Sequence, residues 1–216
     1  MNRAAFFDMD RTLVRRNTGT LYMMWRYQRG EVGLKDMARV GSWLLRYTFG
    51  VLDAEALARN GIQDVAGLDE SHFESELALW YDERVRPHIS GAGRKEVAAK
   101  RDEGFLPVVL SAGTRYAVEP LARELEIEHV LCTQLGVSEG KLTGHCEELC
   151  YGKHKVRIAE RFAAAHNIDL DHSVFYTDSI SDLPMLHRVG EARVINPDPR
   201  LRIVALRQGW PIEQWR

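Results

Sequence analysis

The sequence predicts an α/β fold: a doubly wound, Rossmann-like parallel sheet with a small helical cap inserted after the first strand. Three observations lead to this prediction. Residues 4–7 form an apolar run too short for a helix, which is typical of a strand covered on both faces. Residues 14–87 have apolar side chains at helical spacing and no convincing strand. After residue 87, apolar runs alternate with helical patterns, as expected for a parallel sheet.

We therefore expect an α/β core domain made of residues 1–13 and 88–216, and a helical cap domain of residues 14–87. At 216 residues the chain has room for such a core with a smaller insert. The hinges between the two parts are expected near residues 14–16 and 86–87.

The composition is that of an ordinary globular protein, with 45% hydrophobic and 28% charged residues. A formal net charge of −2 gives no electrostatic support to nucleic-acid binding. No apolar run approaches the length of a membrane span, and the chain enters its first strand too early for a signal peptide. The cysteines Cys132, Cys146 and Cys150 are odd in number and lack a framework spacing, so we expect a reduced, cytoplasmic setting.

The segment between residues 14 and 87 predicts four short helices. The first two are marked by residues near helical spacing: Leu21, Met24, Trp25 and Gln28, then Met37, Val40, Leu44 and Leu45. Gly30 and Gly33 separate these helices, and Gly50 ends the second. A third helix is expected from an N-cap at Asp53. The fourth is expected to begin near Asp69 or Ser71 and to carry Phe73, Leu77, Trp80 and Tyr81.

The remainder of the chain predicts alternating strands and helices. Strands are expected at residues 105–110, 128–133, 173–177 and 192–195, and a hairpin at 136–146 with its turn at Glu139-Gly140. Helices are expected at residues 93–103, 115–126 and 155–166, after Pro184, and after residue 199. Gly104 ends the first of these helices, and Pro120 is expected in the early part of the second.

Polar side chains follow three of the expected strands: Asp8 and Asp10, Ser111 with Gly113, and Asp178 with Asp182. In a doubly wound sheet these strand ends face one crevice. Asp8-Met9-Asp10 taken alone is explained better by a strand followed by a solvated acidic turn. Buried carboxylates at a strand end, however, are compensated most simply by a hard cation such as Mg²⁺.

The complete set suits phosphoryl transfer, in which Mg²⁺ and a lysine neutralise the phosphate oxygens while N–H groups and a hydroxyl hold them. A carboxylate such as Asp8 can then be the nucleophile. A second carboxylate on the same turn can protonate the leaving oxygen and later activate water.

In order and placement, these motifs resemble those of the haloacid dehalogenase superfamily of phosphatases. The chain is most similar to subfamily IB, the branch that includes phosphoserine phosphatase. Residues 8–13 resemble the Asp-x-Asp-x-Thr motif, Ser111 resembles the second motif, and residues 178–182 resemble the Asp-Ser-x-x-Asp motif. The third motif is a lysine ahead of the last catalytic strand. The tail at residues 196–202 and 209–211 is also similar to that branch.

The resemblance implies a role for each matching residue. Asp8 would be the nucleophile and a Mg²⁺ ligand, and Asp10 the general acid/base, with its backbone carbonyl on the metal. Asp178 would bind Mg²⁺ directly, and Asp182 would act on a metal-bound water or on the lysine. Ser111 would hold a phosphate oxygen, helped by the backbone N–H groups of Met9, Asp10, Ala112 and Gly113.

Two lysines, Lys153 and Lys155, fit the third motif. We favour Lys155 as the catalytic residue, because it precedes Asp178 by 23 residues, a separation that resembles the family's, and because it opens the predicted helix. Lys153 would then be a solvated neighbour.

The cap is expected to close over the site and contact the leaving group. By its spacing from Asp8, Asn17 stands where phosphoserine phosphatases carry a substrate-recognising glutamate, and Arg59 is off register for their carboxylate-binding arginine. Both departures weigh against phosphoserine. Arg11 is either a solvated turn residue or a substrate contact, so we count Arg11 and Asn17 as candidate substrate-binding residues. Thr12 is expected to brace the loop through its hydroxyl.

Two further clusters have alternative interpretations. The cap is rich in large side chains: Tyr22, Met23, Met24, Trp25, Tyr27, Trp43, Tyr47 and Phe49. We favour packing between short helices over an apolar lining for a bulky or lipid-like leaving group. A second cluster, His145, Cys146, Cys150 and His154, has the residue types of a zinc site, but its spacing favours placement on the hairpin and the loop after it.

The sequence thus predicts a Mg²⁺-dependent phosphatase that hydrolyses a phosphomonoester through an aspartyl-phosphate. Candidate substrates are histidinol phosphate and other small-metabolite or lipid-derived phosphates, with phosphoserine as an alternative. Phosphotransfer to an acceptor other than water would use the same residues. A non-catalytic phospho-ligand-binding protein is disfavoured because every catalytic residue type is present, and dehalogenation because Asp10 and the Mg²⁺ set would be superfluous.

Overall fold

The computed structural model describes residues 2–36, 38, 42 and 62–215. Its centre is a seven-stranded sheet in the order β4-β3-β2-β1-β5-β6-β7. The strands are β1 (Ala4–Phe7), β2 (Leu106–Thr114), β3 (His129–Ser138), β4 (Lys141–Glu148), β5 (Val174–Thr177), β6 (Glu191–Ile195) and β7 (Ile212–Glu213). Strand β4 is antiparallel to β3, and the other neighbouring strands are parallel. The predicted doubly wound α/β fold is confirmed.

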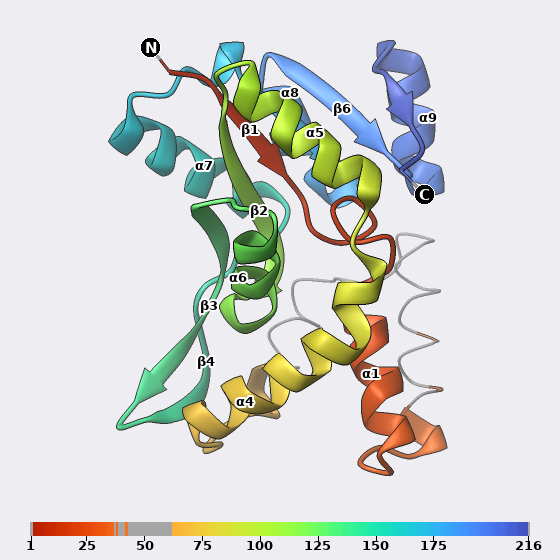
Figure 1. Ribbon diagram of the computed structural model, residues 1–216, viewed down its shortest axis with the longest axis vertical. Coiled ribbons are helices and arrows are strands. Elements are labelled where there is room, and N and C mark those ends of the chain that lie inside the picture. Colours follow the sequence, from red (N-terminus) through yellow and green to blue (C-terminus); the bar gives the residue numbers. More distant parts are fainter. Residues whose placement is uncertain (1, 37, 39–41, 43–61, 216) are drawn as a thin grey trace.

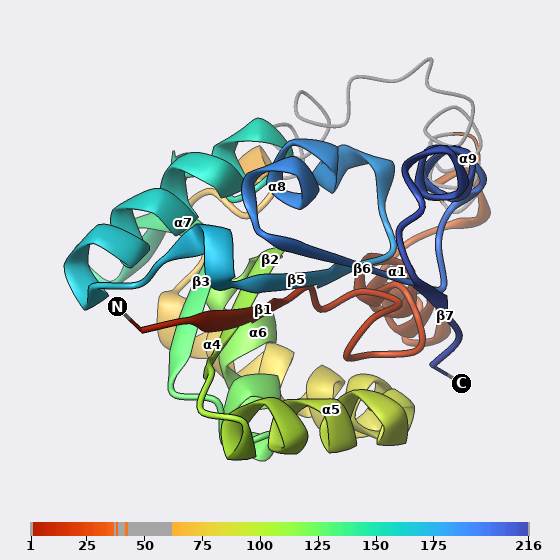
Figure 2. The same cartoon turned by 90° about the horizontal axis from the view of Figure 1, so that it is seen from above.

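Helices cover both faces of this sheet. Figure 2 shows α5 (Gly91–Asp102) and α6 (Arg115–Glu124) on one face, and α7 (Lys153–His166), α8 (Leu183–Arg188) and α9 (Pro199–Gln208) on the other. The side chains of β1 alternate between the two layers. Phe7 belongs to the hydrophobic cluster beneath α5 and α6, and Phe6 to the cluster beneath α7, α8 and α9.

Strand β1 lies in the middle of the sheet, and its position explains its composition. Ala4, Ala5, Phe6 and Phe7 are all fully buried, with β2 pairing on one side and β5 on the other. A strand covered on both faces has no solvent-facing positions, so it reads as a continuous apolar run. The first polar side chain after it, Asp8, therefore stands at the carboxyl end of the central strand, where the chain order reverses.

The helical segment lies beyond this end of the sheet, where Figure 1 shows α1 (Thr18–Gln28) and α4 (Glu70–Trp80). Asn17 caps α1 and Asp69 caps α4, which confirms the expected start of the fourth helix. The chain continues from α4 as a π-helical turn (Tyr81–Val85) and a 3₁₀ turn (Arg86–His88). Of the markers for the second and third helices, Met37, Val40, Leu44, Leu45, Gly50 and Asp53 lie outside the described residues.

The two connections between this segment and the sheet lie side by side. Val14 forms an antiparallel bridge with Ile89, and the backbone N–H of Arg15 donates to the carbonyl of His88 at 2.8 Å. The N–H of Ser90 donates to the carbonyl of Leu13 at 2.8 Å. These bonds hold the two chain crossings together next to Asp10.

Several element boundaries differ from the sequence expectation. α5 begins at Gly91, because the Ser90 hydroxyl caps it by accepting the N–H of Gly93 at 3.1 Å. Pro120 is in the interior of α6, as its sixth residue, rather than in its early part. The strands β2 and β3 are longer than expected, because pairing with neighbouring strands extends them beyond their apolar runs. The short strand β7, which pairs with β6, was not expected.

Candidate active site

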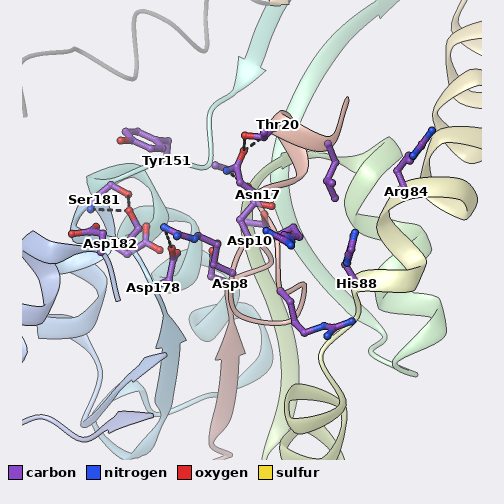
Figure 3. Close-up of a pocket in the computed structure, with 18 of the residues that line it drawn as sticks. Asp8, Asp10, Asn17, Thr20, Arg84, His88, Tyr151, Asp178, Ser181 and Asp182 are labelled. Atoms are coloured by element: carbon purple, nitrogen blue, oxygen red, sulfur yellow. Dashed lines mark hydrogen bonds and ion pairs between the residues drawn. The ribbon is translucent and has the colours of Figure 1, made fainter. Parts of the chain in front are cut away.

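The carboxyl ends of β1, β2 and β5 meet at a cavity of about 960 Å³. The loop after β1 contributes Asp8 and Asp10, and the loop after β5 contributes Asp178 and Asp182 (Figure 3). The end of β2 contributes Ser111. The opposite wall comes from α1 and from the turns after α4. Residues distant in sequence are therefore brought together at the sheet edge, as the doubly wound topology predicts.

Lys155 is at the bottom of the cavity, between two carboxylates. Its Nζ donates to Asp8 Oδ1 at 2.8 Å and to Asp182 Oδ2 at 2.8 Å, and its side chain is 2% exposed. The hydroxyl of Thr177 also donates to Asp182 Oδ2, at 2.7 Å. Lys153, by contrast, is exposed and does not line the cavity. Of the two lysines that fit the sequence pattern, Lys155 is the one at the site.

The electrostatics of this cluster are dominated by burial. Burial lowers the pKa of Lys155, but the carboxylates of Asp182 and Asp8 outweigh this and raise it, so the ammonium is retained. Burial raises the pKa of Asp8 to about 7, although Lys155 opposes the shift. It also raises the pKa of Asp10, and that of Asp178, which has Asp8 and Asp10 as like-charged neighbours. The site therefore contains more buried negative charge than Lys155 alone compensates.

Asp10 is held by the beginning of α1. Its Oδ1 accepts the backbone N–H of Thr18, and its Oδ2 accepts the side-chain amide of Asn17, both at 2.9 Å. The Oδ1 of Asn17 accepts the N–H of Thr20 at 2.9 Å and so caps the same helix. Asn17 lines the cavity as expected of a substrate-binding candidate, but its amide N–H is directed at Asp10 (Figure 3).

Ser111 is 3% exposed and lies where β2 departs from regular pairing. Ser111 pairs with Cys132 and Thr114 with Thr133, so Ala112 and Gly113 form a bulge. Bulges of this kind are common beside active sites, where they redirect the backbone. Ala112 lines the cavity, whereas the N–H of Gly113 donates to the Ser111 hydroxyl oxygen at 3.2 Å. Gly113 and Met9, both expected to present N–H groups to a phosphate, do not line the cavity, and the Met9 side chain is in the hydrophobic core.

The loop after β5 is tied to the loop after β6. The N–H of Asp198 donates to the carbonyl of Asp178 at 2.8 Å, and Asp198 Oδ2 accepts the N–H of Ile180 at 2.7 Å. Arg11, whose backbone has a left-handed φ of 54°, places its Nη1 3.8 Å from Asp178 Oδ2. Thr12 is fully buried, but its hydroxyl has no hydrogen-bond partner among the described residues, so the expected brace through that hydroxyl is not found.

The donor set fits a hard divalent cation. Asp8 and Asp178 offer carboxylate oxygens at the cavity, and the buried Oδ1 of Asp182 has no hydrogen-bond partner in the described part of the chain. Among residues 2–36, 38, 42 and 62–215, no three His, Cys, Asp or Glu side chains form a closed metal-binding cluster. Mg²⁺ does not require one, because it binds through one or two carboxylates and completes its shell with waters and substrate phosphate.

Sequence reasoning missed part of the cavity wall. Thr20, Arg84, His88 and Tyr151 line it, and none was singled out beforehand. Arg84 and His88 are four residues apart, a spacing that indicates a shared helical face, but their position opposite the strand ends depends on the fold.

The described large side chains of the helical segment mainly pack together. Trp25 is 2% exposed and donates its indole N–H to Glu83 Oε2 at 2.8 Å, and Tyr22 contacts both Trp25 and Trp80. Leu21, Met24 and Trp25 also line the cavity. Trp43, Tyr47, Phe49 and Arg59 lie outside the described residues. The cluster of His145, Cys146, Cys150 and His154 is distributed over β4, the loop after it and the start of α7.

The chain is similar to known proteins both in sequence and in structure. Residues 5–187 match the family model described as haloacid dehalogenase-like hydrolase. A probable phosphatase of Mycobacterium tuberculosis is 31% identical over 212 residues, covering 97% of this chain and 74% of the relative. A histidinol-phosphatase of Neisseria meningitidis is 26% identical and covers 98% of both chains. A phosphoserine phosphatase solved as an analogue of its phospho-aspartyl intermediate has a TM-score of 0.73 and 21% identity, covering 100% of this chain and 94% of that one.

Proposed function

The chain belongs to the haloacid dehalogenase-like hydrolases and is a phosphatase of that family, and from this premise we propose that it hydrolyses a small phosphomonoester through an aspartyl-phosphate on Asp8. One observation carries the proposal. Asp8, paired with the buried Lys155, opens onto the same cavity as Asp10, Ser111 and Asp178. This is the set of groups that in-line phosphoryl transfer requires.

The reaction has two displacements. In the first, Asp8 Oδ2 attacks phosphorus, the bond to the leaving oxygen breaks, and Asp10 gives that oxygen its proton. In the second, Asp10 takes a proton from water as the water oxygen attacks phosphorus, which releases inorganic phosphate and restores the Asp8 carboxylate. Lys155 and the Ser111 hydroxyl hold phosphate oxygens in both steps. Burial raises the pKa of Asp10, which favours the protonated form needed first.

Bound Mg²⁺ would neutralise phosphate oxygens and the excess of buried carboxylates. Asp8, Asp178 and the backbone carbonyl of Asp10 are the groups proposed to hold it, with Asp182 acting on Lys155 and on a water of the metal's shell. Lys155 and Thr177 fix one oxygen of Asp182, and the other is left for such a water.

The helical segment supports a cap role. We propose residues 14–87 as a cap inserted into a core of residues 1–13 and 88–216, with hinges near residues 14–16 and 86–87, beside the bridge between Val14 and Ile89. In the described residues, α1 and the turns after α4 form the wall that a leaving group would touch.

No helix in the described part of the chain has the length and apolarity needed to cross a bilayer. We retain the cytoplasm as the proposed location.

The test is phosphate release from p-nitrophenyl phosphate with and without Mg²⁺, with Asp8→Asn as the control. We expect Mg²⁺-dependent release by the wild type and none by the variant. Release that survives in Asp8→Asn would indicate a contaminant. Nitrophenol formed in excess of phosphate when an alcohol is added would indicate transfer to that acceptor. Inactivity of both proteins towards a broad ester panel would favour a binding protein.

For the substrate, the same panel should include histidinol phosphate, phosphoserine and lipid-derived phosphates. One relative is named histidinol-phosphatase, which supports the first. A phosphoserine enzyme was expected to carry a substrate-recognising glutamate at the position of Asn17. Asn17 instead donates to Asp10, which weighs against phosphoserine.

A further inference from the structure

Two basic side chains, Arg84 and His88, line the cavity on the wall opposite the strand ends. Figure 3 shows them on the far side of Asp10 and Asn17 from Asp8 and Asp178. A phosphate held at Asp8 and Lys155 would therefore have its leaving group directed towards this wall. Arg84 and His88 have no part in the chemistry described above.

Local structure fixes where these two side chains are. The π-helical turn Tyr81–Val85 buries Tyr81 and Val85, and the 3₁₀ turn with Pro87 follows directly. Because the buried pair anchors the turn, Arg84 and His88, four residues apart, face the cavity. Wide turns of this type are frequent at functional sites.

Arg84 has hydrogen-bonding capacity that is not used. Its Nη2 donates to Gln28 Oε1 of α1, which holds the guanidinium in place. Its Nε is shielded from solvent and has no hydrogen-bond partner among the described residues. A shielded N–H without an acceptor is unfavourable, and an incoming anion would supply that acceptor.

The surroundings of His88 are also basic. Arg15, Arg16 and His88 all line the cavity, so three basic side chains converge there. Burial, Arg16 and Arg15 lower the pKa of His88, and a bound anion would oppose that shift and favour the charged imidazolium. Arg15 Nη2 is bonded to the carbonyl of Pro87 at 3.0 Å, which keeps it on this wall. Glu83 also lines the cavity, and its Oε2 accepts the indole N–H of Trp25. Asp82 pairs with Arg86. Within the described ranges, no carboxylate forms an ion pair with Arg84 or His88.

We propose that Arg84 and His88 bind a second anionic group, a carboxylate or phosphate carried by the leaving group of the substrate. The inference rests on the proposed function, since it assigns the substrate class of the same cavity. Leu21 and Met24 line the space beside them and suit a short apolar linker between the two anionic ends. The preferred substrate is then a phosphomonoester of an anionic alcohol. This class excludes histidinol phosphate, the candidate that one relative's name supports, because its leaving group carries no negative charge.

The test uses matched pairs of esters: 2-carboxyethyl, 3-carboxypropyl and 4-carboxyphenyl phosphate, each beside its carboxamide. The shape is nearly constant within a pair, and the charge differs. We expect kcat/KM of the wild type to favour the carboxylate in at least one pair. Arg84→Gln should reduce that preference about ten-fold or more, since a hydrogen bond to a charged group contributes about 1.5–3 kcal/mol and 1.4 kcal/mol is a factor of ten.

Arg86→Gln is the matched control. Arg86 is two residues away, at the start of the 3₁₀ turn, but it pairs with Asp82 and Glu124 and does not line the cavity. It should leave the carboxylate-to-carboxamide ratio unchanged. If Arg84→Gln melts far below the wild type, His88→Gln provides the same comparison.

Two results would overturn the inference: no pair in which the carboxylate is preferred, or an equal loss on both members of a pair in the Arg84 and His88 variants. Asp8→Asn separates this from failure of the proposed function, because it should abolish turnover of every ester. Turnover lost in Asp8→Asn with an unchanged ratio in Arg84→Gln would mean that the phosphatase stands and the anion site does not.

Discussion

The side-chain amide of Asn17 forms hydrogen bonds through both its oxygen and its nitrogen. The oxygen caps α1 at the N–H of Thr20, and the nitrogen donates to Asp10. The group proposed to move the proton is therefore oriented by the N-cap residue of α1. A residue counted from sequence as a substrate contact has a geometry better suited to positioning.

Asn17→Asp separates these two tasks. Aspartate is as good an N-cap as asparagine, so the melting temperature should stay within a few degrees of the wild type. The new carboxylate cannot donate to Asp10, so Asp10 loses a hydrogen bond that orients it, and proton delivery to the leaving oxygen should weaken by about ten-fold or more. The loss should be larger for an alkyl phosphate than for p-nitrophenyl phosphate, whose leaving group needs less protonation. Equal losses on both esters would contradict the positioning role.

Lys155→Met tests the buried ion pairs, with the exposed Lys153→Met on the same helix as control. Removing Lys155 leaves Asp8 and Asp182 buried without their cation, which should cost about 3 kcal/mol of stability near pH 8 and abolish turnover.

The stability loss in Lys155→Met should shrink at lower pH. When the pKa of a carboxyl is higher in the folded than in the unfolded protein, folding becomes more favourable as the pH falls from the folded pKa to the unfolded pKa. The pKa of Asp8 is already raised to about 7 in the presence of Lys155. Melting curves at pH 5 and pH 8 measure this. A pH-independent loss, or an equal loss in Lys153→Met, would count against the ion-pair account.

At the scale of elements, helix starts are decided by single caps. Ser90 is fully buried, and its hydroxyl accepts the N–H of Gly93 at the first turn of α5. Ser90→Ala should lower the free energy of unfolding by about 1 kcal/mol, measured by urea denaturation. The control is Ser75→Ala on the exposed face of α4, where the hydroxyl bonds back to the Ser71 carbonyl. That change should be neutral or slightly stabilising.

The central elements were predictable because their signals are local. Three short stretches of the sequence predict both the fold and the polar side chains at the strand ends. They are the apolar run ending in Asp8, the strand before Ser111 and the strand before Asp178. The rest depends on tertiary structure. β7 has two residues and exists through pairing with β6, and Pro120 is tolerated inside α6. Arg84 and His88 belong to the cavity wall only because the turns after α4 pack against α1.

Over the whole molecule, the helical segment is attached to the sheet at a second place. The backbone N–H of Gly67 donates to the Leu142 carbonyl at 2.8 Å, and the N–H of Leu142 donates to the Leu68 carbonyl at 2.9 Å. The tip of the β3–β4 hairpin therefore contacts the chain just before α4 (Figure 1). Together with the paired crossings at Val14 and Ile89, this restrains α4 relative to the sheet.

Two glycines of the hairpin test this contact. Gly140 and Gly144 both have left-handed φ values, 73° and 75°, so Gly→Ala strains either backbone by about 1–2 kcal/mol. A Cβ at Gly140 meets no atom, whereas one at Gly144 would lie 2.7 Å from the Ala66 Cβ. Gly144→Ala should therefore lower the melting temperature more than Gly140→Ala, and adding Ala66→Gly should remove the difference. Equal effects of the two single changes would show that the contact is unimportant.

The central place of β1 has a consequence for how the chain is made. Strand β1 precedes both of its partners in the chain, residues 106–109 on one side and 174–176 on the other, so it is synthesised well before them. Until those partners are made, the apolar side chains of β1 are not covered, and a nascent chain stalled before residue 174 would be prone to misassociation. Strand β1 is thus enclosed on both sides only after the later strand β5 has been made.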